Sequence, residues 1–570
     1  MKKSILRLLS LGLLLMAVNG GGLFAGGAQA GGTNASGRSL YRADVYTQLA
    51  NYAGAQVGWF AKLIKDKFNL EFNIIPTADG VFATRMASGN LGDLIVFGQN
   101  GSEYTTAIEA GQLLDWSKGD ILDKYGPDIK KNLSKALQHN RDTFGGGKAT
   151  YGFGHDVAVS ADGTQSAFYH PDIRFDLYQK IGSPPINTMM DYLNVLKRMV
   201  DAQPIGDSGL PAYAISLFPD WDGDVVMSVK CIGAFYGYDE FGFTLYNAAD
   251  NTVQPIFDNN SFYLQGLRFY NRAFQMGILD PDSATQTFSD VVTKYADGRV
   301  YWSMFSWLGP SNYNTVERMA QGKGMFAVAA KDQKNIVYGN NVYGGDRNWN
   351  IGVKAKYPER LMEFINWLCT PEGIMESSYG PKGVTWDYDA NNKPYFTELG
   401  IKVQADPTTM MPASAGGGTY ADGQNKINNS TFTPDEINPV SGEKYNKDFW
   451  SSELARAPSV AKAAWQKAMG VLSEDEYLKK NNYITVSTGS NFVKNEGRSV
   501  DLEQKYKQVS QVIKDGSWRA IYARTDAEFD RLVAEMIAQA KGLGYDECLA
   551  WDIQDGRKRA AAVARAKASN

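Results

Sequence analysis

The side chains that could bind or transform a ligand are mainly aromatic rings, carboxylates and carboxamides. The 570-residue sequence holds 12 Trp and 31 Tyr but only 3 His and 3 Cys. Flat aromatic faces pack against the C–H face of ring-shaped ligands, and Asp, Asn and Gln make oriented hydrogen bonds to hydroxyl groups. The composition therefore favours a pocket for a polar, ring-shaped solute, with larger aromatic cores as the alternative explanation.

Two tryptophans follow predicted strands closely. Trp221 and Asp222 lie in an aspartate-rich turn after a predicted strand at 213–217, and Trp307 follows a predicted buried strand at 300–305. Crevice sites in open α/β sheets lie beyond the carboxyl ends of strands, so these residues are candidate ligand contacts. The aspartates around Trp221 also suggest calcium, but Val225 stands where the calcium-loop pattern needs Gly. We predict no metal site.

A second group of candidates also lies beside predicted strand ends and turns. Gln99 and Asn100 directly follow the predicted strand at 94–97, where an ordinary turn is the alternative explanation. Further candidates are Tyr52, after the first predicted strand, Trp386, after a glycine turn, and Trp349, which could face the ligand or brace a crossover of the chain. Trp302 lies within its predicted strand and is expected in the core.

Catalytic motifs are absent from the sequence. The three histidines are not spaced as a metal pair, and no G-x-S-x-G nucleophile elbow occurs. A glycine-rich stretch at 145–148 fails as a phosphate loop because Ala149 replaces the required hydroxyl residue. The alternative left open is a secreted glycoside hydrolase, which needs two carboxylates roughly 5–10 Å apart. Eight successive strand–helix units, as in a (β/α)8 enzyme, are not found. We predict that the protein is not an enzyme and needs no cofactor.

The first thirty residues have the order of a secretory signal. Lys2, Lys3 and Arg7 precede an apolar run at 8–18, and an A-x-A signature ends at Ala30. Cleavage near Ala30 removes three positive charges and takes the net charge from -4 to -7. No other stretch has 18 unbroken apolar residues, so the mature chain is expected to be soluble, in the periplasm or outside the cell. The negative charge argues against nucleic acid as a partner.

The cysteines give no disulfide framework. Cys231, Cys369 and Cys548 are far apart, and none lies near the cleavage site, where a lipid anchor would be attached. We expect three buried thiols, with a single disulfide as the alternative.

Hydrophobic periodicity predicts alternating strands and helices. The first batch contains strands at 41–50, 69–76 and 94–97, with helices at 58–68 and 79–88 between them. Such alternation is typical of a parallel sheet covered by helices. A second batch and a helical tail follow, with helices at 175–180, 188–201, 261–276, 289–296, 358–368, 458–469, 502–515, 526–541 and 556–567, and a short strand at 167–169. Residues 405–440 are predicted to be a long loop or insertion.

Several segments, taken in order, resemble the extracellular solute-binding proteins of ATP-driven sugar importers, family 1, oligosaccharide-binding branch. They are Asn69-Leu-Glu-Phe-Asn-Ile-Ile-Pro76, Met86-Ala-Ser-Gly-Asn-Leu-Gly-Asp93, Phe168 to Asp172, Ile181 to Leu193, Tyr295 to Met304, Lys354 to Gly373 and Tyr379 to Trp386. Met189 stands where the family usually has Trp. The similarity spans roughly residues 40–545.

The resemblance implies an α/β, periplasmic-binding-protein-like fold of two discontinuous lobes joined by a multi-strand hinge. The expected division is 38–160 with 310–395 for lobe 1, and 161–309 with 396–570 for lobe 2. Asp156 then lies near the first crossover and is another candidate contact. The implied function is capture of a carbohydrate, in particular an oligosaccharide, in the interlobe cleft. The implied partners are the membrane permease subunits of an ABC importer, and the protein is expected to be a monomer.

Overall fold

The computed structural model describes residues 37–568 except 79, 162, 248 and 488–497. The predicted signal segment and its cleavage site lie outside these residues. Within the described part of the chain, no helix is both long and apolar enough to cross a membrane.

A six-stranded sheet organises one part of the molecule, which we call the first lobe. Its strand order is β2-β3-β1-β4-β13-β5, with β1 parallel to both β3 and β4, and β13 antiparallel to β4 and β5. Leu70, Phe72 and Ile74 alternate along β3 and are buried. The strands are β1 Tyr41–Thr47, β2 Gly54–Ala55, β3 Leu70–Pro76, β4 Leu94–Phe97, β5 Gly152–Gly154 and β13 Asn348–Ile351.

Helices α1 Gly58–Phe68 and α14 Pro358–Trp367 pack in the core of this lobe. Helix α1 buries Trp59, Phe60 and Ile64 at helical spacing and ends at Asn69, whose backbone is left-handed with φ 50°. The other elements of the lobe are α2 Val81–Ala87, α3 Ser102–Glu109, α4 Ile121–Tyr125, α5 Pro127–Asn132, α6 Ser134–Thr143, α15 Pro371–Tyr379, β14 Trp386–Tyr388, β15 Pro394–Phe396, α16 Glu398–Ala405, α17 Tyr420–Gly423, β16 Ile437–Asn438, β17 Glu443–Lys444 and α18 Ser451–Leu454.

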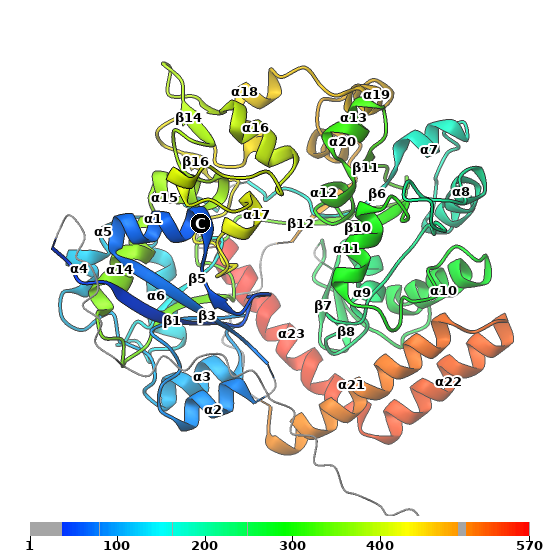
Figure 1. Cartoon of the computed structure of the whole chain (residues 1–570). Helices are drawn as coiled ribbons and strands as arrows, with labels where there is room; N and C mark the ends of the chain where they lie inside the picture. Colours follow the sequence, from blue (N-terminus) through cyan, green and yellow to red (C-terminus); the bar gives the residue numbers. More distant parts are fainter. Residues whose placement is uncertain (1–36, 79, 162, 248, 488–497, 569–570) are drawn as a thin grey trace, which may run out of the picture.

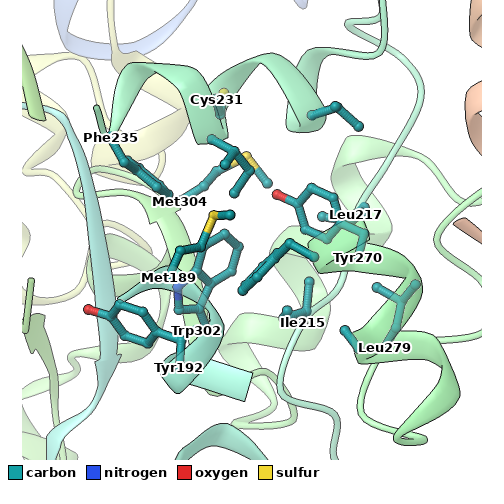
Figure 2. Packing of buried hydrophobic residues seen from close by; sticks show 14 of the residues in the cluster. Met189, Tyr192, Ile215, Leu217, Cys231, Phe235, Tyr270, Leu279, Trp302 and Met304 are labelled. Carbon is teal, nitrogen blue, oxygen red and sulfur yellow. The ribbon is translucent and has the colours of Figure 1, made fainter. Parts of the chain in front are cut away.

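The second lobe is built around the antiparallel sheet β10-β6-β11 and a large cover of helices. Figure 2 shows Met189 and Tyr192 packed with Tyr270, Trp302 and Met304 in its core. Its elements are β6 Tyr169–Arg174, α7 Phe175–Lys180, α8 Met189–Ala202, α9 Met227–Ala234, β7 Tyr238–Phe241, β8 Thr244–Asn247, β9 Val253–Pro255, α10 Phe262–Gln275, α11 Phe288–Ala296, β10 Trp302–Phe305, α12 Gly309–Tyr313, α13 Val316–Ala320, β11 Met325–Ala327, α19 Val460–Met469, α20 Glu474–Lys480, α21 Val500–Ile521, α22 Asp526–Gly542 and α23 Tyr545–Ala568.

The two cores show how the chain is shared between the lobes (Figure 1). The first core draws its residues from 41–157 and 349–450, and the second from 173–330 and 461–548. The chain therefore passes from one core to the other three times. The first and second passages are tied together, because Gln165 N donates to the Tyr338 carbonyl at 2.8 Å. Strands β12 Asn335–Tyr338 and β18 Ile484–Ser487 pair in parallel beside them.

Two segments pack in a different core from the lobe to which the expected boundaries assign them. Phe326 and its neighbours up to Ala330 belong to the second core, and Phe396 to Trp450 belong to the first. The predicted loop at 405–440 contains α17, whose Tyr420 stacks on Trp59 of α1 with ring centroids 5.5 Å apart. We therefore propose that the lobe boundaries follow the cores. They then lie near residues 330 and 455, in place of the expected 310 and 396.

Most local predictions agree with the structure. The predicted helices at 58–68, 188–201 and 358–368 match α1, α8 and α14 within one residue at each end. The predicted strand at 213–217 forms only isolated bridges, Tyr213 to Val300 and Ile215 to Leu279. Strand β6 begins at Tyr169, where the predicted strand at 167–169 ends. The three cysteines are buried free thiols, as expected.

Candidate functional site

An aromatic cluster with two half-exposed indoles lies on the second lobe. Trp221 is 38% exposed and Trp307 is 40% exposed, and their ring centroids are 5.8 Å apart. Trp221 stacks on Phe288 at 4.5 Å, and Trp307 stacks on Phe305 at 5.0 Å. We call these four residues the aromatic platform. Figure 1 places α11, which begins with Phe288, and α12, which begins just after Trp307, on the side of the second lobe turned toward the first.

The aspartates beside Trp221 hold its loop in place. Asp220 accepts a hydrogen bond from Phe288 N at 2.7 Å, at the start of α11. Asp222 accepts from Met227 N at 2.9 Å, at the start of α9, and from the Trp518 indole N–H at 2.8 Å. Carboxylates suit helix N-termini because the first backbone N–H groups there lack helical partners. Asp222, a predicted ligand contact, therefore positions Trp221 in this structure, with both carboxylate oxygens accepting hydrogen bonds from the protein.

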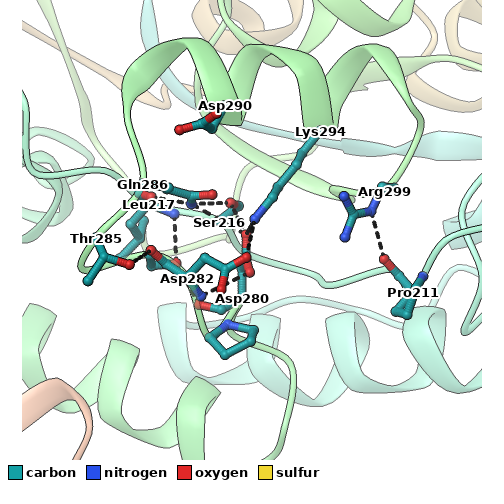
Figure 3. A network of polar contacts seen from close by, with 12 residues as sticks. Pro211, Ser216, Leu217, Asp280, Asp282, Thr285, Gln286, Asp290, Lys294 and Arg299 are labelled. Atoms are coloured by element: carbon teal, nitrogen blue, oxygen red, sulfur yellow. Dashed lines mark hydrogen bonds and ion pairs between the residues drawn. The ribbon is translucent and has the colours of Figure 1, made fainter. Parts of the chain in front are cut away.

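A buried polar network holds α11, the helix that begins with Phe288, in place (Figure 3). The Lys294 ammonium lies 2.7 Å from Asp280, whose carboxylate also accepts from Ser216 Oγ at 2.6 Å. Gln286 donates to the Leu217 carbonyl at 2.6 Å and to Ser216 Oγ at 2.8 Å. Because the network joins α11 to the backbone that leads into the Trp221 loop, it sets the spacing between Phe288 and Trp221.

The first lobe contributes a polar loop at the carboxyl ends of its parallel strands. The segment 425–430 contacts the end of β1, since Thr47 Oγ1 donates to the Ile427 carbonyl at 2.9 Å. Asn428 Nδ2 donates to the Leu49 carbonyl at 2.7 Å. The Lys426 ammonium lies 5.7 Å from the centre of the Tyr52 ring, and the Tyr52 hydroxyl donates to the Ala55 carbonyl at 2.7 Å. This edge of the sheet is where α/β proteins bind ligands.

A cavity of about 440 Å³ lies beside this loop. Ser430 Oγ donates to Asp156, and both residues line the cavity. The amide nitrogen and oxygen of Asn429 are buried and have no hydrogen-bond partner among the described residues. A buried amide without partners is costly, so this side chain is suited to a ligand or water in the cavity. Other lining residues are Arg347, Ser377, Ser378, Tyr379, Asn425, Asn428, Thr431 and Tyr445.

The neighbour of Asp156 in the sequence, His155, has a lowered pKa. Burial lowers the pKa of the His155 imidazole, and the Asp156 carboxylate, with its oxygen 3.6 Å from Nε2, opposes this only in part. Arg347 N donates to His155 Nδ1 at 3.3 Å. The charged groups at this end of the cavity are therefore Asp156 and Arg347.

Two predicted contacts are core residues instead. Trp349 and Trp386 are both 0% exposed. The Trp349 indole N–H donates to the Ser430 carbonyl at 2.6 Å, and that of Trp386 donates to the Gly380 carbonyl at 2.8 Å. Because core packing covers both faces of these rings, neither can stack on a ligand in this conformation. Trp349 instead anchors the polar loop through its hydrogen bond to Ser430. Trp302 is also in the core, as expected.

The adjacent candidates Gln99 and Asn100 differ in exposure. Gln99 is exposed directly after β4, whereas Asn100 is only 5% exposed. Sequence reasoning missed Phe288, Asn428 and Asn429. Phe288 lies within a helix-capping Thr-x-x-Asp pattern, directly after its Thr. The other two lie in the run Asn425-Lys-Ile-Asn-Asn-Ser430, whose dense carboxamides were the available signal.

Solved structures match nearly the whole chain. The alginate-binding protein AlgQ2, without calcium ion, is 16% identical over 90% of this chain and 98% of its own, with a TM-score of 0.61. The S. pneumoniae ABC-transporter substrate-binding protein FusA, in complex with kestose, is 15% identical over 91% and 100%, with a TM-score of 0.58. The fold is that of the periplasmic binding proteins.

A third solved structure, an HMO-binding, ABC-transporter-associated solute-binding protein from Bifidobacterium longum infantis, is 14% identical over 92% of this chain and 99% of its own, with a TM-score of 0.57. No protein-family model and no curated protein matches the sequence. The matches confirm the predicted α/β fold of two lobes, in which the platform and the polar loop belong to different lobes.

Proposed function

We propose that this protein is the extracytoplasmic solute-binding component of an ABC importer and that it captures a carbohydrate, in particular an oligosaccharide. The observation that carries the proposal is the pair of half-exposed indoles, Trp221 and Trp307, whose rings lie 5.8 Å apart on the second lobe. Indole faces suit the C–H faces of sugar rings. The matching structures include an alginate-binding protein, a complex with kestose and an N-glycan transport protein, which supports the same ligand class.

In this proposal the two lobes supply different chemistry. The platform stacks on sugar rings, and the first lobe offers hydroxyl-binding groups, among them Gln99, Asn429 and Asp156. Ligand favours the closed form only through contacts that the open form lacks. The closed form then docks on the membrane permease subunits, and the ATP is hydrolysed elsewhere. The protein acts as a monomer in the periplasm or outside the cell and uses no cofactor.

The alternative, a secreted glycoside hydrolase, needs two carboxylates facing each other across the scissile bond. The carboxylates beside the platform, Asp220 and Asp222, instead accept hydrogen bonds from backbone amides of α11 and α9. A binding role without turnover is therefore the better supported function.

Titration calorimetry on the chain from residue 31 onward, with a panel of mono- and oligosaccharides, tests the proposal. We expect one sugar bound per chain and no release of reducing ends on prolonged incubation. Absence of binding to every sugar, together with turnover of a chromogenic glycoside, would support the hydrolase instead.

Replacing Trp307 by Ala is expected to weaken sugar binding by about 1–3 kcal/mol, and Trp221→Ala by a similar amount, because each removes a stacking face. Stability should change little, since both rings are half-exposed. Tyr395→Ala is the matched control: Tyr395 is 37% exposed on β15, away from the platform, and its loss should leave affinity unchanged. Unchanged affinity in both Trp variants would remove the platform from the site.

A further inference from the structure

A buried cluster of three ionisable side chains lies away from the proposed sugar site, in the second lobe. His170 and Asp172 are two residues apart on β6, so their side chains project from the same face of the strand. Glu474, the first residue of α20, meets them there. The ligand-type atoms of all three lie within 4.8 Å of one another, and His170 Nδ1 is 3.3 Å from Asp172 Oδ2. His170 is 2% exposed and Asp172 is 0% exposed.

The hydrogen bonding of this cluster is incomplete. Within the described part of the chain, His170 Nδ1 and both carboxylate oxygens of Asp172 have no hydrogen-bond partner. Glu474 accepts from Ala327 N at 2.6 Å with one oxygen and presents the rest of its carboxylate to the cluster. A buried carboxylate without hydrogen bonds is expensive. A bound cation would stabilise the cluster, and a divalent ion balances two carboxylates and a neutral imidazole.

We propose that His170, Asp172 and Glu474 form a structural site for a divalent metal ion of the zinc type. Tetrahedral zinc holds its ligands at about 2.0–2.1 Å, which places neighbouring ligand atoms about 3.4 Å apart. The 3.3 Å between His170 Nδ1 and Asp172 Oδ2 fits this spacing. One imidazole and two carboxylates suit zinc or manganese, whereas calcium takes six to eight oxygen ligands.

The place of the site in the fold indicates what the metal does. Strand β6 lies at the end of the first passage between the lobes, and α20 comes after the third passage and α19. Glu474 already joins α20 to β11 through Ala327 N. A metal held by both β6 and α20 links the end of the first passage to the segment that follows the third. It therefore stabilises the part of the second lobe next to these passages.

Protons compete with the metal for these atoms, because imidazole and carboxylate groups bind a metal ion only when they are deprotonated. The affinity for the metal should therefore increase with pH.

The test uses the tag-free chain from residue 31 onward, stripped of metal by a chelator that is then removed. Zinc chloride is titrated by calorimetry, bound metal is measured by mass spectrometry, and thermal unfolding is followed with and without zinc. We expect one zinc per chain, a raised Tm, and no comparable effect of calcium or magnesium. His170→Asn and Glu474→Gln should each weaken zinc binding by roughly 100-fold or more, because each removes a ligand.

His139→Asn is the matched control, because His139 is a histidine of the first lobe outside the cluster and its loss should leave zinc binding intact. Glu474→Gln keeps the shape of the side chain, so a folded variant remains even where His170→Asn fails to fold. Absence of zinc uptake by the folded protein, or equal uptake in Glu474→Gln, overturns the proposal. Stability that depends on pH but on no metal overturns it as well and makes the cluster a proton site.

Discussion

At the scale of single residues, many carboxylates of this protein accept hydrogen bonds from its own backbone N–H groups. Three carboxylates surround Trp221 in the sequence and suggest a ligand or a metal, yet Asp220 and Asp222 accept backbone N–H groups at the starts of α11 and α9. The spacing of these residues does not reveal their role. The helix that Asp220 contacts lies far away in the sequence, and the contact of Asp222 with α9 depends on how the loop folds. The indole between them is 38% exposed, and its role as a ligand contact remains a proposal.

Asp552 gives the stability of the fold a dependence on pH. Burial raises the pKa of Asp552 to about 7, although its carboxylate accepts from the Tyr506 hydroxyl at 2.6 Å and from Phe243 N at 2.8 Å. The cationic Arg498 lowers this pKa and the anionic Asp224 raises it. An ordinary Asp has a pKa near 3.9, so the folded state binds an extra proton between about pH 4 and pH 7.

The contribution of Asp552 to stability is therefore full below about pH 4 and is lost as the pH rises through 7. We expect it to reduce the free energy of unfolding by up to about 4 kcal/mol between these limits. Urea denaturation of the wild type and of Asp552→Asn at pH 5 and pH 8 measures this. The variant should lose less stability over that interval than the wild type; equal losses in the two proteins would contradict the assignment.

At the scale of elements, helix α11 carries one side of the platform and depends on a buried ion pair. The Lys294 side chain lies 2.7 Å from Asp280, which is 0% exposed, and 2.9 Å from Asp282. Removing one partner of a buried pair leaves the other charge uncompensated in a medium of low polarity. The position of α11, and with it Phe288, thus depends on Lys294.

Lys294→Met is expected to destabilise the protein by about 3–5 kcal/mol, because it leaves Asp280 charged and unpaired. Lys294→Met with Asp280→Asn should recover part of this loss. Denaturant unfolding measures both, with Lys197→Met as the control, since Lys197 pairs with Asp201 on the surface and such pairs contribute about 0–1 kcal/mol. A loss below about 1 kcal/mol in Lys294→Met would show that the network is not important for stability.

At the scale of the whole molecule, the proposed function depends on two lobes joined by three passages of chain. The platform and the polar loop belong to different cores, so in this proposal a ligand between the lobes contacts both. The passages near 158–172, 331–348 and 451–460 are the segments across which a movement of the lobes would take place.

Saturating sugar is expected to reduce the radius of gyration of the mature protein in solution, because closure brings the lobes together. Small-angle X-ray scattering with and without the sugar measures this. A sugar that shows no heat of binding is the control and should leave the scattering unchanged. An identical radius of gyration at full occupancy would show that the ligand binds without closure.

The sequence predicted well the positions of helices and strands, which depend mainly on neighbouring residues. Helices α1 and α14 and strand β4 match their predicted ranges closely, because periodicity, proline at the first helical turn and glycine turns act locally. The contact between Trp221 and Trp307 could not be predicted in this way. Both residues were candidates, but no local sequence pattern indicates that their rings lie 5.8 Å apart.

By itself, the sequence determined the alternation of strands and helices, the positions of most of them and the choice of indoles as candidate contacts. Only the tertiary structure decided that Trp349 and Trp386 are buried, that residues 396–450 pack in the first core, and that His170 and Asp172 meet Glu474. The physical reason is that the exposure of a side chain depends on which distant segments pack against it, and hydrophobic patterns record that a face is covered without recording by what.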